Sequence, residues 1–243
     1  MADKYNLIVG LGATPLTSQM LKLLEMQIFD FPFDFISGGD FFTRMNFFLS
    51  NCNNFIQQKN IVMQKDTPVE GNTQFKDLES GFIYHIDFNP ELPVENNFPG
   101  VKTKYDKYIR HLNLSVRAAK KILIVYIEDP LNKEDDEQNM ALVLEATHKL
   151  KEKYPKKEFR IMYVQNDEDA ENIKYIQIGK DAEKICINFY RKFSEASARQ
   201  IDLDILGLVF EGIELKKTWQ QKKLFFYQKL LNSVIRFRQE HKI

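Results

Sequence analysis

Short apolar runs alternate along the chain with segments of helical spacing, and this pattern is typical of an α/β protein. Residues 7–9, 122–127 and 159–164 form apolar runs of strand length, and residues 134–154 repeat apolar positions at helical spacing. Continuous apolar runs are typical of strands buried on both faces, and strands separated by helices usually pair in parallel. We therefore predict a mostly parallel, doubly wound sheet flanked by helices in three layers.

The first apolar run ends in a glycine turn that leads into a helical pattern. Gly10 and Gly12 permit a tight reversal of the backbone, and the apolar residues that follow recur at helical spacing. Thr14 is the predicted N-cap of this helix, and Pro15 is its predicted first residue. Proline suits that position because the first backbone N–H of a helix has no partner within the helix.

The next part of the chain predicts a second helix, a strand and a loop. Residues 41–55 predict a helix rich in phenylalanine, preceded by Asp40, a residue type that caps helices well. Residues 82–88 predict a buried strand that holds His85. Residues 89–100 contain three prolines and a glycine, which predicts a loop, and a helical pattern follows it.

The C-terminal third predicts further strands and a closing helix. Residues 174–178 and 185–189 have the length and composition of strands. Residues 219–238 form an amphipathic pattern and predict a helix that closes the sheet. We expect a single α/β domain over residues 1–243.

Motifs in the first half of the chain carry a resemblance to a known family. They are Gly-Leu-Gly at residues 10–12, Phe-Pro-Phe-Asp-Phe at residues 31–35 and Tyr-His-Ile-Asp-Phe at residues 84–88, with a weaker match at residues 104–110. In these motifs the chain resembles a bacterial family of papain-like cysteine peptidases, whose genes often accompany those of surface-polysaccharide biosynthesis. The resemblance implies an α/β fold and a thiol peptidase or acyl-transfer activity.

The chain departs from the family pattern at the nucleophile. The family has a cysteine three residues after the turn glycine, where this chain has Pro15. A cysteine at a helix N-terminus would have a lowered pKa because the helix dipole stabilises its thiolate, and proline cannot replace that function. One residue separates His85 from Asp87, and Lys107 and Tyr108 stand where the family has paired arginines.

The resemblance makes His85 the candidate general base, with Asp87 and Asp34 as candidate acidic residues. Asp87 lies two residues after His85, on the same face of the predicted strand, and is a candidate to orient the imidazole. The alternative for His85 is a core histidine that bonds to a backbone carbonyl.

A hydroxyl group is the candidate replacement for the missing thiol. Thr14 is the first candidate nucleophile, and Thr17 and Ser18 are also near the turn. The alternative for Thr14 is that it only caps the helix. Cys52, in the aromatic helix, is a further thiol whose distance from His85 the sequence leaves open.

Candidate substrate-binding residues lie at the turn and on the helix that follows residue 101. At the turn they are Gly12, Ala13 and Pro15, and on the helix they are Lys107 and Arg110. The basic pair is a candidate for a phosphate or a sugar nucleotide. The alternative is a solvated helix face, which is the more common role of such charges.

Composition excludes several function classes. Lysine plus arginine and aspartate plus glutamate number 34 each, so the chain has no basic excess for nucleic-acid binding. The apolar content of 44% favours a packed core, and no motif indicates a cofactor or a metal. No apolar run reaches the length of about 18 residues that a membrane-spanning helix needs.

Two cysteines and the N-terminal sequence favour a cytoplasmic protein. Cys52 and Cys186 follow no zinc or redox spacing, and the first residues lack the pattern of a signal peptide. Two functions remain open. The first is an enzyme that acts on a glycan or a peptide conjugate with a hydroxyl or an activated water. The second is a non-catalytic protein that binds a glycan precursor or a protein partner. The oligomeric state also stays open.

Overall fold

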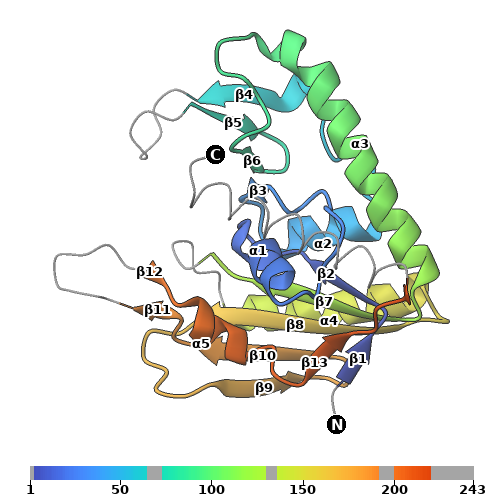
Figure 1. Ribbon diagram of the computed structural model, residues 1–243, viewed down its shortest axis with the longest axis vertical. Helices are drawn as coiled ribbons and strands as arrows, with labels where there is room; N and C mark the ends of the chain where they lie inside the picture. The colour runs from blue at the N-terminus through green and yellow to red at the C-terminus, as the bar shows by residue number, and fades with distance from the viewer. Residues whose placement is uncertain (1–2, 65–72, 130–135, 192–199, 220–243) are drawn as a thin grey trace, which may run out of the picture.

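The computed structural model describes residues 3–64, 73–129, 136–191 and 200–219. Its largest sheet is five-stranded and mixed, with parallel pairing everywhere except at one edge strand (Figure 1). In spatial order the strands are β2 (Leu7–Gly10), β7 (Lys121–Ile127), β8 (Glu158–Asn166), β10 (Ala182–Ile187) and the antiparallel β9 (Lys174–Ile178). The predicted α/β class with a mostly parallel sheet is therefore confirmed.

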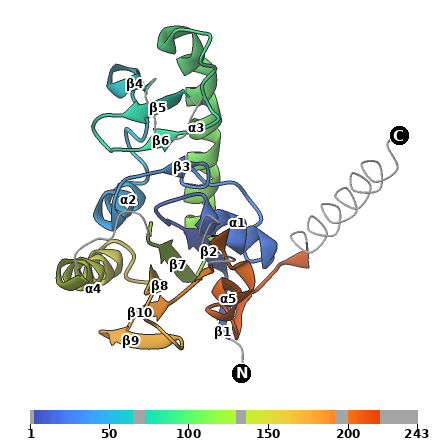
Figure 2. The same ribbon diagram turned by 90° about the vertical axis from the view of Figure 1, so that its left-hand side faces the viewer.

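Helices cover both faces of this sheet (Figure 2). They are α1 (Leu16–Leu23), α2 (Phe41–Leu49), α3 (Val94–Ala118), α4 (Asp136–Lys153) and α5 (Leu203–Leu208). Alternate residues of each strand point to opposite faces, so Ile124 joins one apolar cluster and Val125 joins the other. Helices α2, α3 and α4 pack in the first cluster, and α1 and α5 pack in the second.

The strand order differs from the predicted doubly wound order. The first strand of this sheet, β2, lies at one edge, and the later parallel strands β7, β8 and β10 follow it in one direction across the sheet. Right-handed crossovers that progress in one direction place their helices on the same face, as observed for α3 and α4. The parallel strands therefore have no point at which their order reverses, where such sheets commonly bind ligands.

A second, four-stranded antiparallel sheet lies beside α3 (Figure 1). Its spatial order is β3 (Ile36–Ser37), β6 (Ile83–Tyr84), β5 (Gln74–Asp77) and β4 (Ile61–Gln64), which follows the 3₁₀ turn η1 (Gln58–Asn60). Two short pairs complete the described strands: β1 (Asp3–Tyr5) with β13 (Ile213–Leu215), and β11 (Tyr190–Arg191) with β12 (Gln200–Ile201).

Several predicted boundaries are wrong. The loop predicted over residues 89–100 is half helix, because α3 begins at Val94 and includes Pro99. Pro99 removes the N–H that would bond to the carbonyl of Glu95, and both residues are exposed, so this gap in the helical hydrogen bonds lies on the solvent side of α3. Helix α2 ends at Leu49 and not at residue 55. The closing helix predicted over residues 219–238 lies, after Trp219, outside the described residues.

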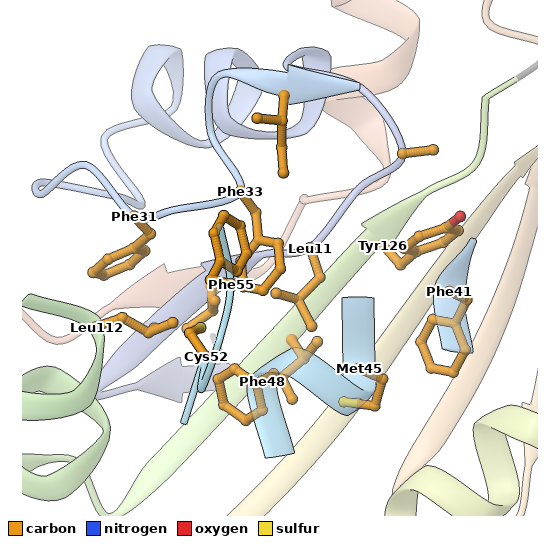
Figure 3. Packing of buried hydrophobic residues seen from close by; sticks show 14 of the residues in the cluster. Leu11, Phe31, Phe33, Phe41, Met45, Phe48, Cys52, Phe55, Leu112 and Tyr126 are labelled. Carbon is orange, nitrogen blue, oxygen red and sulfur yellow. The ribbon is translucent and has the colours of Figure 1, made fainter. Parts of the chain in front are cut away.

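An aromatic core joins α2 to both sheets (Figure 3). Phe33 packs edge-on against Phe55 with ring centroids 5.2 Å apart, and Phe41 packs edge-on against Tyr126 at 5.3 Å. Edge-to-face pairs add stability beyond the area that they bury. This core supports the segment from Phe33 to Phe41, which contains one part of the candidate site. None of the helices within the described ranges is long and apolar enough to cross a membrane.

Candidate functional site

Ser37 and His85 form the central contact of the candidate site. Ser37 ends β3, and His85 directly follows β6, the strand that pairs with β3. The Nε2 atom of His85 lies 2.7 Å from the Oγ atom of Ser37. In the tautomer with its proton on Nδ1, the imidazole accepts the hydroxyl proton at Nε2. This is the geometry of a nucleophile and its general base.

His85 is exposed, so the prediction of a buried strand histidine is wrong. Strand β6 ends at Tyr84, and the strand predicted over residues 82–88 is much shorter than expected. Partial desolvation lowers the pKa of the His85 imidazole below 6.5, and the charge of Asp87 acts in the opposite direction. A lowered pKa favours the neutral imidazole, which is the form that accepts a proton.

Asp87 acts on His85 through its charge, because both of its carboxylate oxygens bond elsewhere. Its side chain is fully buried, and Oδ1 lies 2.6 Å from the Nζ atom of Lys104. The hydroxyl of Tyr105 donates to Oδ2 at 2.8 Å. Burial of Tyr105 and the nearby carboxylate raise the pKa of its phenol, so the hydroxyl stays protonated and donates. Asp87 therefore joins α3 to the segment that holds His85.

Two aromatic rings and two ammonium groups lie beside the Ser37–His85 pair. Phe35, two residues before Ser37, stacks on Tyr108 of α3 with ring centroids 5.5 Å apart. The Nζ atoms of Lys22 and Lys104 lie 5.0 Å and 5.1 Å from the centroid of the Phe35 ring. Both lysines are partly exposed, and each also pairs with a carboxylate: Lys22 with Asp30 and Asp34, and Lys104 with Asp87.

Asp34 holds the turn that precedes β3. Its Oδ2 atom accepts hydrogen bonds from Nε2 of Gln27 at 2.6 Å and from the backbone N–H of Phe31 at 3.0 Å. Lys22 Nζ lies 3.3 Å from the same oxygen. Burial raises the pKa of the Asp34 carboxyl to about 6, although the Lys22 charge acts in the opposite direction. Among the described residues, its Oδ1 atom is buried without a hydrogen-bond partner.

In the part of the chain that the structure describes, the hydroxyls nominated from the sequence form no hydrogen bond with His85. Thr14 makes no cap hydrogen bond, and the residue at the N-cap is Pro15. Oγ1 of Thr17 is buried without a partner, and the Ser18 hydroxyl donates to backbone oxygens of Pro15 and Asp34. The sequence has no local signal for Ser37, because His85 is 48 positions away in the chain.

The backbone of the glycine turn is engaged within the fold. A Cβ atom at Gly12 would lie 1.6 Å from Oγ1 of Thr17, so only glycine fits there. The N–H of Ala13 donates to the carbonyl of Ile127 at 2.9 Å, and its own carbonyl accepts from Gly38 at 3.0 Å. Pro15 is half-buried. The other nominated binding residues, Lys107 and Arg110, are exposed on α3.

Arg44 of α2 holds the backbone around Ser37. Its side chain is fully buried and 0% exposed, an unusual place for a charged group. Its guanidinium donates to backbone carbonyls, which are those of Ala13, Ile36, Gly38 and Gly39. Gly38 and Gly39 have φ angles of 73° and 64°, a left-handed conformation that other residues adopt only at a cost. A buried cation thus fixes the loop that presents Ser37.

Cys52 is buried in the apolar core that joins α2 to the two sheets (Figure 3). Figure 3 shows its side chain with those of Phe48, Phe55 and Leu112. Burial raises the pKa of its thiol far above the ordinary value, so the thiol stays protonated and unreactive. The described residues contain no group of three or more histidine, cysteine, aspartate or glutamate side chains that could hold a metal ion.

No known protein assigns a role to the residues of this site. No protein-family model matches the chain, and no match is found among curated proteins or among solved structures.

Proposed function

We propose that this chain is a hydrolase or an acyl-transfer protein with a serine nucleophile, in which Ser37 attacks an acyl carbon and His85 is the general base. The observation that supports this proposal is the 2.7 Å contact between Oγ of Ser37 and Nε2 of His85. The lowered pKa of the imidazole favours the neutral, proton-accepting form at pH 7. In this proposal Ser37, and not Thr14, replaces the thiol of the papain-like family.

The proposed reaction proceeds in two balanced steps. Oγ of Ser37 forms a bond to the carbonyl carbon of an ester or amide, and its proton moves to Nε2 of His85. The bond to the leaving group then breaks, and the imidazolium gives that proton to the leaving oxygen or nitrogen. Water, activated by the same imidazole, hydrolyses the acyl-serine and restores the free hydroxyl. In acyl transfer, another hydroxyl or amine takes the place of water.

The wider context of this proposal rests on the family resemblance alone. It includes membership of the papain-like cysteine peptidase family, a link to surface-polysaccharide biosynthesis, and a glycan or peptide conjugate as the substrate. We also propose a cytoplasmic location, and a single three-layer domain closed by a C-terminal helix.

A binding protein without catalysis is the second candidate. Two observations favour it: Pro15 stands at the cysteine position of the family, and both oxygens of Asp87 bond to Lys104 and Tyr105. A hydroxyl is a weak nucleophile unless its base is correctly oriented, and in triads a carboxylate provides this orientation. In this alternative, the partly exposed lysines Lys22 and Lys104 and the rings of Phe35 and Tyr108 would bind a ligand that is not converted.

Labelling with a fluorophosphonate, which reacts with activated serines, distinguishes these candidates. We expect the probe to attach to Ser37, as identified by mass spectrometry of the digested protein. Ser37→Ala and His85→Gln should each reduce labelling by at least about 100-fold, because the nucleophile and its base act as a unit. Ser50→Ala changes an exposed serine that bonds only to a nearby carbonyl, and it should leave labelling unchanged.

Equal labelling of the unchanged chain and of Ser37→Ala would overturn the catalytic proposal. The absence of any labelling would do the same, provided that circular dichroism shows the chain to be folded. Either result would favour the binding protein.

A further inference from the structure

We propose that a second site, on the other flank of α3 from Ser37 and His85, binds a carbohydrate. The site is a cavity of about 790 Å³ between the loop that follows α2 and the middle of α3. Its lining includes amide side chains, namely those of Asn53, Asn54, Gln57 and Gln58. The proposal does not depend on the proposed catalytic function.

The amides of this cavity face solvent, since Asn53, Asn54 and Gln58 are exposed and Gln57 is half-buried. Within the described ranges, the side chains of Asn53, Asn54, Gln57 and Gln58 make no hydrogen bond to the protein. Each amide has two N–H donors and one oxygen acceptor in a fixed plane. A ligand that fits these groups needs many atoms that both donate and accept, and the hydroxyls of a sugar have this property.

The loop that holds the amides has a strained and well-anchored backbone. Asn51, Cys52 and Asn54 have φ angles of 59°, 58° and 54°, a left-handed conformation that residues with a side chain adopt only at a cost. The structure around them compensates for this cost. Phe55 and Cys52 are buried in the aromatic core, which fixes the inner side of the loop (Figure 3).

Three side chains from distant elements anchor Asn51 at the start of the loop. Lys153 and Tyr154, at the end of α4, donate to Oδ1 of Asn51 at 2.7 Å and 3.2 Å. Asn113 of α3 donates to its backbone oxygen at 3.2 Å. These bonds order the loop before a ligand arrives, so less conformational entropy is lost on binding.

The charge and shape of the remaining lining favour a neutral or singly anionic sugar. Lys102 and Asp106 pair with each other, with Nζ 2.6 Å from Oδ1, which leaves Lys59 as the one lining cation without a bond to the described residues. The apolar side chains of Phe98 and Ile109 also line the cavity. Sugars have C–H faces that pack on such surfaces, while their hydroxyls bond to amides.

The cavity and the Ser37–His85 pair are separated by the body of α3. Lys102, Asp106 and Ile109 follow one flank of the helix at spacings of four and three residues. Lys104 and Tyr108 follow the opposite flank, beside Phe35. A sugar in the cavity therefore leaves the hydroxyl of Ser37 free.

Nuclear magnetic resonance of the side-chain amides tests this proposal. The probes are glucose, galactose, mannose, rhamnose, N-acetylglucosamine and glucuronate, each added to about 100 mM because single sugars bind weakly. We expect at least one of them to shift the amide signals of Asn53 and Gln57 saturably. Asn53→Ala combined with Gln57→Ala should weaken that binding by about fivefold or more through lost hydrogen bonds.

Matched variants keep the result interpretable. Asn96→Ala and Gln19→Ala remove exposed amides elsewhere, and both should bind the sugar like the unchanged chain. Ser37→Ala should also bind it equally, since the two sites are separate. The absence of saturable shifts with all six sugars, equal binding by the double variant, or shifts only with acetamide as a peptide-like probe would overturn the carbohydrate assignment. Backbone spectra confirm that each variant is folded.

Discussion

Arg44 donates from Nη2 to the carbonyl oxygen of Gly38 at 2.7 Å, at the residue that follows Ser37 in the chain. The cation is buried under the loop, and its donors replace the water that these carbonyls would otherwise bind. The position of the Ser37 hydroxyl therefore depends on a charge in the core of the protein.

Replacing Arg44 should strongly destabilise the fold. Arg44→Met keeps the length of the side chain but leaves the carbonyls of Gly38, Ile36 and Ala13 without these donors, and we expect a loss of about 3 kcal/mol or more in unfolding free energy. Urea unfolding measures the loss. Arg110→Met, on the exposed part of α3, is the control and should change the free energy by less than about 0.5 kcal/mol. Equal urea midpoints for Arg44→Met and the unchanged chain would contradict this role of Arg44.

Asp34 should make the stability of the chain fall as the pH rises. The pKa of its carboxyl is about 6 in the folded chain and 3.8 as the reference value, so the folded state binds more protons between these values. The free energy of unfolding therefore decreases through this window, by about 3 kcal/mol for a shift of about two units. Asp34→Asn should remove the decrease.

Urea unfolding of both forms from pH 4 to pH 7 measures this difference. Asp30→Asn removes the partly exposed carboxylate that lies 2.6 Å from Lys22, and so controls for the loss of one charge beside that lysine. If the difference in unfolding free energy between the original chain and Asp34→Asn is the same at every pH from 4 to 7, the Asp34 carboxyl does not titrate in that range.

Labelling of Ser37 should depend on the protonation of His85. Because the pKa of the imidazole is lowered from 6.5, the rate should rise with pH to a plateau, with its midpoint below 6.5. The charge of Asp87 raises that pKa, so Asp87→Asn should move the midpoint to lower pH. Fluorophosphonate labelling rates across the pH range measure both midpoints. A midpoint that is unchanged in Asp87→Asn would mean that its charge does not act on the imidazole.

Gly12 should tolerate no larger side chain. The Cβ atom of Gly12→Ala would lie 1.6 Å from Oγ1 of Thr17, and we expect a loss of about 1–3 kcal/mol from overpacking. Gly100→Ala, a matched change within α3 with nothing within 4 Å, should instead stabilise the chain by about 0.5–1 kcal/mol. Differential scanning calorimetry ranks the variants. Thr17→Ala added to Gly12→Ala should recover part of the loss, and no recovery would assign the effect to another contact.

Local chemistry allowed much of the fold to be predicted from the sequence. The apolar run at residues 122–127 became β7, and Asp40 caps α2 by accepting from the N–H of Thr43 at 2.7 Å. Both features depend on residues that are close in the chain. The length of β6 was not predictable, because it is set by pairing with β3, a strand more than 40 positions away.

In the candidate site, too, some features could be predicted from the sequence and others could not. His85 was nominated from the sequence, but its partner Ser37 was not, and Thr14 forms no hydrogen bond with His85 within the described residues. Asp87 was nominated to orient the imidazole, but in the structure both of its carboxylate oxygens bond to side chains of α3, namely Lys104 and Tyr105. A side chain near in sequence can point to a different partner, and a single sequence does not show which one.

Local sequence predicts the type and place of most elements: apolar runs indicate strands, helical spacing indicates helices, and a capping residue such as Asp40 indicates where a helix begins. The order of the strands, the contact of Ser37 with His85 and the burial of Arg44 are seen only in the folded chain. These two groups of features differ in the range of the interactions that produce them. Periodicity and capping act between neighbours in the chain, whereas hydrogen bonding across strands and desolvation of charges depend on residues that folding brings together from distant positions.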